Sequence, residues 1–333
     1  MSADVLLTGA TGLLGNAIAR ALVTEGRRVR ALVRNIDKAK AVVPQGCELV
    51  AGDVCNAASV LAAAQGCAVV YHASGLPEQW LADIREFERV NVDGTRNVIA
   101  AARAVGAQRF VYASTIDVFR FPGPGIPFDE SELDTAPKAT AYERSKQEAD
   151  RIVVAALDDG LPAVFLHPSG IYGAGPLTSP GTNHLIADLV RGKVPMLLPG
   201  AIPVVYSDDV AAGHVLAEKH AAIGARYILS ESTHSLTAIA EAVRRITAES
   251  GKASKVPSVM PTAVASIVAS VGEWISSWTG KPPLLPKGQL EFLQYGAVPS
   301  GKKAIDELGW RPRGFEQGLR ETLAFLRAQG RIQ

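Results

Sequence analysis

Cysteine is scarce in this sequence, which has only Cys47, Cys55 and Cys67. No two of them have the Cys-x-x-Cys spacing of a zinc site, and an odd number argues against a disulfide framework. We therefore expect no metal site. A reducing, cytoplasmic compartment fits this pattern best.

An excess of charge is also missing, because 34 Lys and Arg stand against 33 Asp and Glu. Such a balance gives no uniform field to attract nucleic acid or an anionic membrane. The sequence shows no basic, apolar leader before its first β-branched residues at Val5. Its most apolar late segment, residues 256–275, is broken by Pro257, Pro261 and Glu273, so we expect no transmembrane helix.

What the first half does contain is a regular alternation of short apolar runs and helical patterns. The runs lie at residues 5–7, 29–33, 48–50, 68–71, 109–112 and 163–166, and a long helical pattern covers residues 85–105. Strands this short and apolar are typical of a parallel sheet that helices cover on both faces. The sequence therefore predicts an α/β fold with a Rossmann-type, doubly wound parallel sheet.

After Pro168 the alternation is interrupted by loops rich in Gly, Pro and Ser, and helical patterns then dominate. These patterns lie at residues 236–249, 262–278, 302–308 and 315–328. We expect a dinucleotide-binding domain over residues 1–168, to which residues 201–230 return. Residues 169–200 and 231–333 should form a smaller, helix-rich C-terminal lobe that binds the substrate.

A glycine-rich turn follows the first predicted strand and opens the first predicted helix. It reads Thr-Gly-Ala-Thr-Gly-Leu-Leu-Gly and places glycine at Gly9, Gly12 and Gly15. Glycines there permit a tight turn and let backbone amides approach a pyrophosphate, which the helix N-terminus also favours. A dinucleotide site is the interpretation that this context favours over an ordinary strand–helix turn.

The residue after the second predicted strand points to the cofactor. An acidic residue there would accept hydrogen bonds from the adenosine ribose, but this chain has Arg34, with Lys38 and Lys40 nearby. A guanidinium can instead bind a 2′-phosphate, so NADP is favoured over NAD. The alternative is a solvated basic surface. Asp53 could accept from the adenine amino group or could cap a helix.

Tyr142 and Lys146 lie four residues apart in a helical pattern, so their side chains share one face. A nearby ammonium should lower the pKa of the phenol and let it exchange a proton with a carbonyl or hydroxyl oxygen. Thr115, at the end of the fifth strand, could orient the same oxygen. Such a pair alone is more often a surface pair, but the glycine-rich turn upstream favours catalysis.

With these motifs the chain resembles the extended short-chain dehydrogenase/reductase superfamily. Further matches lie at residues 71–74, 91–98, 167–173, 205–210 and 303–312. The resemblance implies that Thr115, Tyr142 and Lys146 are catalytic and that the protein forms a homodimer. The implied cofactor-binding residues are Gly9, Thr11, Gly12, Leu13, Gly15, Arg34, Lys38, Asp53, Val54, Ala73, Ser114, Tyr142, Lys146 and Pro168.

Two departures from the superfamily pattern bear on the substrate. Sugar-nucleotide enzymes of the superfamily carry an Asn in the loop after the sixth strand and an Arg before the strand at residues 204–206. This chain has Pro168-Ser169-Gly170 and Gly200-Ala201-Ile202-Pro203 there. The candidate pocket residues Leu76, Trp80, Phe119 and Tyr172 are apolar or aromatic, although such side chains could equally pack between loops.

The resemblance is nearest to the dihydroflavonol reductase-like and 3β-hydroxysteroid dehydrogenase-like branches. We therefore expect an NADP-dependent oxidoreductase that reduces a ketone or aldehyde on a small apolar substrate, or oxidises the alcohol. One alternative is a sugar-nucleotide epimerase or dehydratase with tightly bound NAD(P). Another is a non-enzymatic NADP-binding redox sensor.

A stripe of large apolar residues runs along the predicted helix at residues 262–278. Its members are Val264, Ile267, Val268, Val271, Trp274, Ile275 and Trp278. The simplest interpretation is a lobe helix that buries its apolar face. The alternatives are a lid over the site, or a surface that contacts a membrane or a partner.

Overall fold

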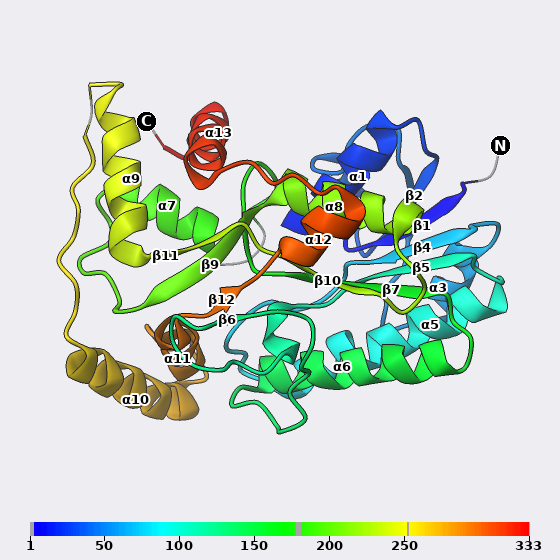
Figure 1. Ribbon diagram of the computed structural model, residues 1–333, viewed down its shortest axis with the longest axis horizontal. Helices are drawn as coiled ribbons and strands as arrows, with labels where there is room; N and C mark the ends of the chain where they lie inside the picture. The colour runs from blue at the N-terminus through cyan, green and yellow to red at the C-terminus, as the bar shows by residue number, and fades with distance from the viewer. Residues whose placement is uncertain (1–2, 178–180, 252, 333) are drawn as a thin grey trace.

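The larger part of the protein is a seven-stranded sheet whose strands all pair in parallel (Figure 1). The computed structural model describes residues 3–177, 181–251 and 253–332. In spatial order the strands are β10 (Arg226–Leu229), β7 (Ala163–Pro168), β5 (Arg109–Ala113), β4 (Val69–His72), β1 (Val5–Thr8), β2 (Val29–Val33) and β3 (Glu48–Ala51). The chain order reverses between β1 and β4, and ligands of doubly wound sheets bind at this switch point. The predicted Rossmann-type sheet is confirmed.

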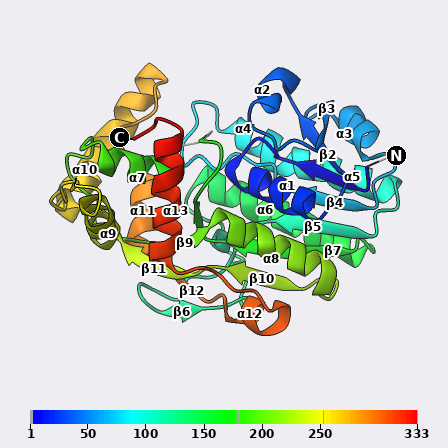
Figure 2. The ribbon, with the colours of Figure 1, turned by 90° about the horizontal axis from the view of Figure 1, so that it is seen from above.

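Helices cover both faces of this sheet, as the apolar strands require. On one face lie α1 (Leu13–Thr24) and α8 (Ser207–His220), which pack together; on the other lie α3 (Ala57–Ala64), α5 (Gly94–Ala104) and α6 (Ala141–Asp158) (Figures 1 and 2). The short helix α2 (Ile36–Lys40) follows β2. Two separate apolar clusters fill the space on the two sides, because side chains alternate between the faces of each strand. The sheet is therefore buried on both faces.

The helix predicted over residues 85–105 has a wider turn inside it. Its first turn is α4 (Arg85–Phe87), a π-helical segment spans η1 (Glu88–Asp93), and α5 continues from Gly94. Asn91 in the π segment donates to Ser145 Oγ at 2.9 Å, and Asn91 Oδ1 accepts from the backbone N–H of Leu76 at 2.8 Å. π segments recur at functional sites because they redirect a side chain. Here the segment joins the loop after β4 to helix α6.

A smaller sheet lies beyond the carboxyl ends of the large one. Its strand order is β11 (Ser232–Ser235), β9 (Ala201–Tyr206) and β8 (Gly170–Tyr172). The helices α7 (Thr182–Val190), α9 (Leu236–Ala248) and α13 (Phe315–Ala328) share an apolar cluster with it. Of residues 201–230, β9 thus lies in the small sheet, whereas α8 and β10 belong to the large one.

The remaining elements connect the two sheets. Strands β6 (Pro127–Phe128) and β12 (Val298–Pro299) pair with each other, and the turn η2 (Ile116–Val118) follows β5. Helix α12 (Lys302–Leu308) packs on α8 and β10, and α11 (Lys287–Tyr295) packs on α10 (Thr262–Thr279). Within the described ranges, no helix has both the length and the apolar character needed to span a membrane.

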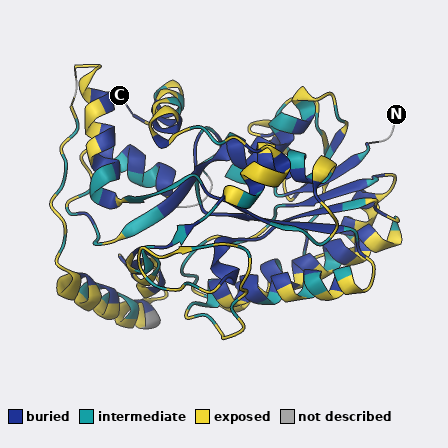
Figure 3. Cartoon of the chain, in the orientation of Figure 1, coloured by how far each residue is buried: buried dark blue, intermediate teal, exposed yellow. Residues whose placement is uncertain are grey.

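Helix α10 carries six of the seven large apolar residues of the stripe on the outside, and Val268 alone among them packs partly against the cluster with α11. The interpretation that the helix buries its apolar face is therefore wrong. Val264, Ile267, Val271, Trp274, Ile275 and Trp278 are all exposed, the last of them 79% (Figure 3). The buried face instead presents the small residues Ala265, Ala269 and Ser276 to α11 and its neighbours. Short side chains allow the two helices to approach closely, and the larger residues then have no room on that side.

Candidate active site

The glycine-rich turn after β1 has the backbone geometry that a dinucleotide cradle needs. Gly9 adopts φ +82°, a conformation that favours glycine, and a Cβ there would lie 2.5 Å from the Ala73 carbonyl oxygen. A Cβ on Gly15 would overlap the Gly9 carbonyl. Gly12 N–H donates to the Gly9 carbonyl at 2.9 Å, which closes the turn. The close approaches of these backbones explain why side chains are absent at these positions.

The turn delivers the N-terminus of α1 to the switch point of the sheet. Gly12 is the N-cap residue and has no side chain with which to cap the helix. The first amides of α1, from Leu13 onward, therefore point toward the space in front of the turn, where an anion is stabilised. Thr11 lies on the same turn, next to Gly12. The residues present fit the pyrophosphate of a dinucleotide.

The basic residues after β2 are exposed. Asn35 caps α2 by accepting from the Lys38 backbone N–H at 2.9 Å, and Lys40 pairs with Asp37 at 3.2 Å. Within the part of the chain that the structure describes, the side chains of Arg34 and Lys38 make no ion pair. Both cations can therefore bind a phosphate at this edge.

Asp53 does not cap a helix. Its Oδ1 accepts from the Cys55 backbone N–H at 2.9 Å, and Asn56 is the residue that caps α3. The neighbouring Val54 is buried, and its carbonyl accepts from Asn97 at 2.8 Å. This turn lies after β3, so it stays available for the adenine end of a nucleotide.

Helix α6 holds Tyr142 and Lys146 at its N-terminal end. A capping box starts the helix: Thr140 Oγ1 accepts from the Glu143 N–H at 3.1 Å, and Glu143 accepts from the Thr140 N–H at 2.9 Å. Lys146 Nζ donates to the Ala113 carbonyl at 3.2 Å, at the end of β5. The cap and this bond fix the position of the pair against the sheet edge.

Thr115 and Ser114, which follow β5, have different partners. Thr115 Oγ1 donates to Asp117 Oδ2 at 2.9 Å, and the Thr115 side chain lies near enough to the Tyr142 phenol to act on its pKa. Ser114 Oγ donates to Asp150 Oδ1 at 2.9 Å and is buried. The structure thus brings Thr115, Tyr142 and Lys146 together. The Ser114 hydroxyl points instead to Asp150, one turn further along α6 than Lys146.

Largely buried polar side chains from α6, β7 and β10 form a network that contacts the loop after β5. Asp150 forms an ion pair with Arg226 on β10 at 2.9 Å, and Arg226 also contacts His167 Nε2 at 3.2 Å. His167 Nδ1 lies 3.2 Å from the Thr115 carbonyl oxygen. Burial lowers the pKa of His167 to about 3, so this ring is neutral and can donate to the carbonyl. Sequence analysis missed Asp150 and Arg226, because the contact joins residues 76 positions apart.

The expected lowering of the Tyr142 pKa by Lys146 is not seen. Burial and the carboxylate of Asp117 raise the pKa of Tyr142 well above its usual value. Burial lowers the pKa of Lys146 to about 8, although Asp150 and Asp117 act in the opposite direction. Lys146 Nζ donates to the Ala113 carbonyl, and the Lys146 charge is not among the main effects on the Tyr142 pKa.

Two of the four predicted pocket residues are packed in the interior. Phe119 is 0% exposed and packs against His167, with ring centroids 4.6 Å apart. Tyr172 is 1% exposed, and its hydroxyl donates to the Phe315 carbonyl at 3.3 Å. These positions fill gaps between loops and strands and do not line open space. Leu76 and Trp80, in the loop after β4, are half-buried and remain candidates. Ala73 and Pro168, at the ends of β4 and β7, border the same edge of the sheet.

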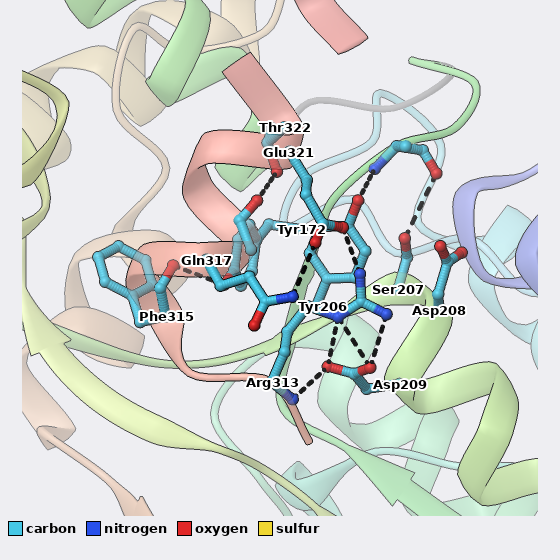
Figure 4. Close-up of polar contacts among 12 residues, drawn as sticks. Tyr172, Tyr206, Ser207, Asp208, Asp209, Arg313, Phe315, Gln317, Glu321 and Thr322 are labelled. Atoms are coloured by element: carbon cyan, nitrogen blue, oxygen red, sulfur yellow. Dashed lines mark hydrogen bonds and ion pairs between the residues drawn. The ribbon is translucent and has the colours of Figure 1, made fainter. Parts of the chain in front are cut away.

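The start of α8 and the segment before α13 meet beside the small sheet, where Figure 4 shows Arg313 against Asp209 and Tyr206. Arg313 contacts both carboxylate oxygens of Asp209, at 3.0 Å and 3.2 Å, and its guanidinium lies 4.1 Å from the centre of the Tyr206 ring. Trp310 Nε1 donates to the Asp209 carbonyl at 2.7 Å. These contacts hold the C-terminal segment against the start of α8.

The sequence model of the NAD dependent epimerase/dehydratase family matches residues 5–229. The chain belongs to this family and is an NAD(P)-dependent enzyme of the extended short-chain dehydrogenase/reductase type. The resemblance stated from its motifs is thereby confirmed.

Three relatives are similar to nearly the whole chain. A Synechocystis sp. protein named for dihydroflavonol 4-reductase is 28% identical over 98% of this chain and 95% of its own length. The 4-hydroxy-2-methyl-3-oxo-4-farnesyl-3,4-dihydroquinoline-1-oxide ketoreductase of Stigmatella aurantiaca is 29% identical over 94% of this chain and 93% of its own length. The 3-beta-hydroxysteroid dehydrogenase of Mycolicibacterium neoaurum is 26% identical over 96% of this chain and 90% of its own length.

Solved structures show the same fold. The crystal structure of gox2253 is 29% identical, superposes with a TM-score of 0.85 and covers 100% of both chains. A UDP-glucose 4-epimerase of Thermus thermophilus in complex with NAD is 25% identical, with a TM-score of 0.75 over 97% and 98% of the two chains.

Proposed function

We propose that this protein is an NADP-dependent oxidoreductase that reduces a ketone or aldehyde on an apolar substrate, or oxidises the corresponding alcohol. The observation that carries the proposal is that Tyr142, Lys146 and Thr115 meet at the carboxyl edge of the sheet, the edge that also carries the glycine-rich turn. A proton donor and a dinucleotide cradle at one sheet edge are what carbonyl reduction requires.

The dinucleotide, when bound, supplies the hydride to the carbonyl carbon or takes it back. Tyr142 gives its phenol proton to the carbonyl oxygen in reduction and removes it from the hydroxyl in oxidation. Lys146 would bind the ribose hydroxyls of the nicotinamide half of the dinucleotide. Thr115, whose side chain lies near the Tyr142 phenol, would orient the same substrate oxygen.

Arg34 supports the choice of NADP, because its exposed guanidinium follows β2 where a 2′-phosphate would lie. We expect Arg34→Glu to weaken NADPH binding by about 10- to 100-fold, the value of one charge-assisted contact, and to affect NADH little. Titration of NADPH and NADH fluorescence measures both affinities. The matched control is Arg28→Glu. Arg28 is also exposed, and it immediately precedes Val29, the first residue of β2. Equal loss for both nucleotides would contradict the role of Arg34.

Two observations support an apolar carbonyl substrate. The loop 168–170 has no amide side chain and residues 200–203 have no arginine, so a diphosphate would lack the usual partners. The relatives named above include a ketoreductase whose name contains a farnesyl group and a hydroxysteroid dehydrogenase. The lobe formed by the small sheet of β8, β9 and β11 with α7, α9 and α13 would cover such a substrate above the sheet edge.

A carbonyl panel tests this function. NADPH and NADH oxidation would be followed with an aliphatic ketone, a steroid ketone, a flavonoid ketone and an aromatic aldehyde, and UDP-glucose would be tested for isomerisation. We expect NADPH-dependent turnover of at least one carbonyl and none of UDP-glucose. Isomerised UDP-sugar would favour an epimerase, and NADPH binding without any turnover would favour a sensor.

A further inference from the structure

Asp117 is a buried carboxyl group beside the proposed catalytic residues, with no part in the steps described above. It lies in the turn η2 and is only 4% exposed. Its Oδ1 atom is buried and has no hydrogen-bond partner among the described residues. A carboxyl group half satisfied in the interior is costly to keep, so its retention at this point calls for a reason.

The other oxygen of Asp117 sets the direction of a hydrogen bond. Thr115 has a single hydroxyl hydrogen, and it is donated to Asp117 Oδ2 at 2.9 Å. The Thr115 hydroxyl therefore has no hydrogen left to donate to the Tyr142 oxygen. A phenolate at Tyr142 would thus receive no hydrogen bond from Thr115, which favours the protonated phenol.

The charges around Asp117 act in the same sense. Tyr142, Glu143 and Lys146 face it from α6, Lys138 from the segment before α6, and Tyr295 from α11. Burial and Glu143 raise the pKa of Asp117 to about 6, against the opposing effects of Thr115, Lys138 and Lys146. The group is therefore a carboxylate at neutral pH. Its negative charge disfavours a second one on Tyr142, which the Glu78 carboxylate also opposes.

We propose that Asp117 is a positioning residue that orients Thr115 and keeps the Tyr142 phenol protonated until a substrate oxygen takes the proton. The inference rests on the proposed function. It adds that Asp117 sets the pH range in which Tyr142 can act as a base. In reduction, Tyr142 transfers its proton to the substrate oxygen and must regain one from solvent. In oxidation, Tyr142 must first be ionised, and Asp117 confines that state to alkaline pH.

Asp117→Asn tests the proposal, since it keeps the shape and the acceptor for Thr115 but removes the charge. The measurement is the pH dependence of kcat/KM for NADP⁺-linked oxidation of the alcohol of the best panel carbonyl. We expect the midpoint to fall by about one pH unit or more, the effect of removing one nearby charge. Glu148→Gln is the matched control, because Glu148 lies on the outer part of α6 and pairs with Arg96 at 3.6 Å; its midpoint should not move. Asp117→Ser, also neutral, serves if the first variant does not fold.

The outcomes separate this inference from the proposed function. A lowered midpoint in Asp117→Asn or Asp117→Ser, with Tyr142→Phe inactive, supports both. An unchanged midpoint with Tyr142→Phe inactive overturns the role of Asp117 and leaves the function standing, even if kcat falls. Full activity of Tyr142→Phe overturns the proposed function itself.

Discussion

Replacing Tyr142 with phenylalanine should lower kcat for carbonyl reduction about a thousandfold while NADPH binding changes little. The phenyl ring can keep its edge-to-face contact with Phe87, whose ring centre lies 6.2 Å away, so the helix should fold as before. Only the proton donor is lost, because the phenol oxygen is the sole atom removed. Steady-state kinetics and NADPH fluorescence titration measure the two effects.

Tyr227→Phe is the matched control for this variant. Tyr227 lies on β10, and its hydroxyl donates to Glu307 at 2.9 Å, away from α6. We expect near-normal kcat for it. A Tyr142→Phe enzyme that turns over as fast as the control would show that another group supplies the proton.

Replacing Arg313 with alanine should lower the free energy of unfolding by about 3–5 kcal/mol. The guanidinium is mostly buried, pairs with Asp209 at 3.0 Å and also contacts Glu321. Burial raises the pKa of Asp209, and Arg313 acts against that effect. Without the arginine the carboxylate stays in the interior without its cation, which is the costly outcome.

Urea unfolding measures this loss, and Arg311→Ala is the control, because Arg311 is the exposed arginine two positions earlier. The deficit of Arg313→Ala should shrink as the pH falls. A carboxyl group whose folded-state pKa is raised gains protons more readily when folded, so low pH favours the folded variant. Equal unfolding midpoints for the two variants would show that the Asp209 pair contributes no net stability.

The fold could be predicted from the sequence because its signals are local. The apolar runs, the turn at Gly9 and the spacing of Tyr142 and Lys146 each lie within one element or one loop. Helices α7 and α11 were missed because Gly- and Pro-rich segments precede them, and such segments predict loops. The π segment around Asn91 was missed because its residues fit a normal helix equally well.

The details of the site depend on contacts between distant residues, which no local pattern contains. Lys146 at the right spacing predicted an acidic phenol, but burial, and then Asp117 from the loop after β5, raise the Tyr142 pKa. Phe119 and Tyr172 have the composition of pocket residues, yet packing between strands buries both. A pattern shows which side chains are available, and tertiary structure decides where they point.

The outward apolar face of α10 has a practical consequence for handling the protein. Side chains such as Trp274 and Trp278 are exposed in the folded chain, so we expect them to favour self-association in solution more than folding. Serine or glutamate at these two positions would change the unfolding free energy little and would make the protein easier to concentrate. The inward Ala265 and Ala269 allow no such freedom, because any larger side chain there would push α10 away from α11.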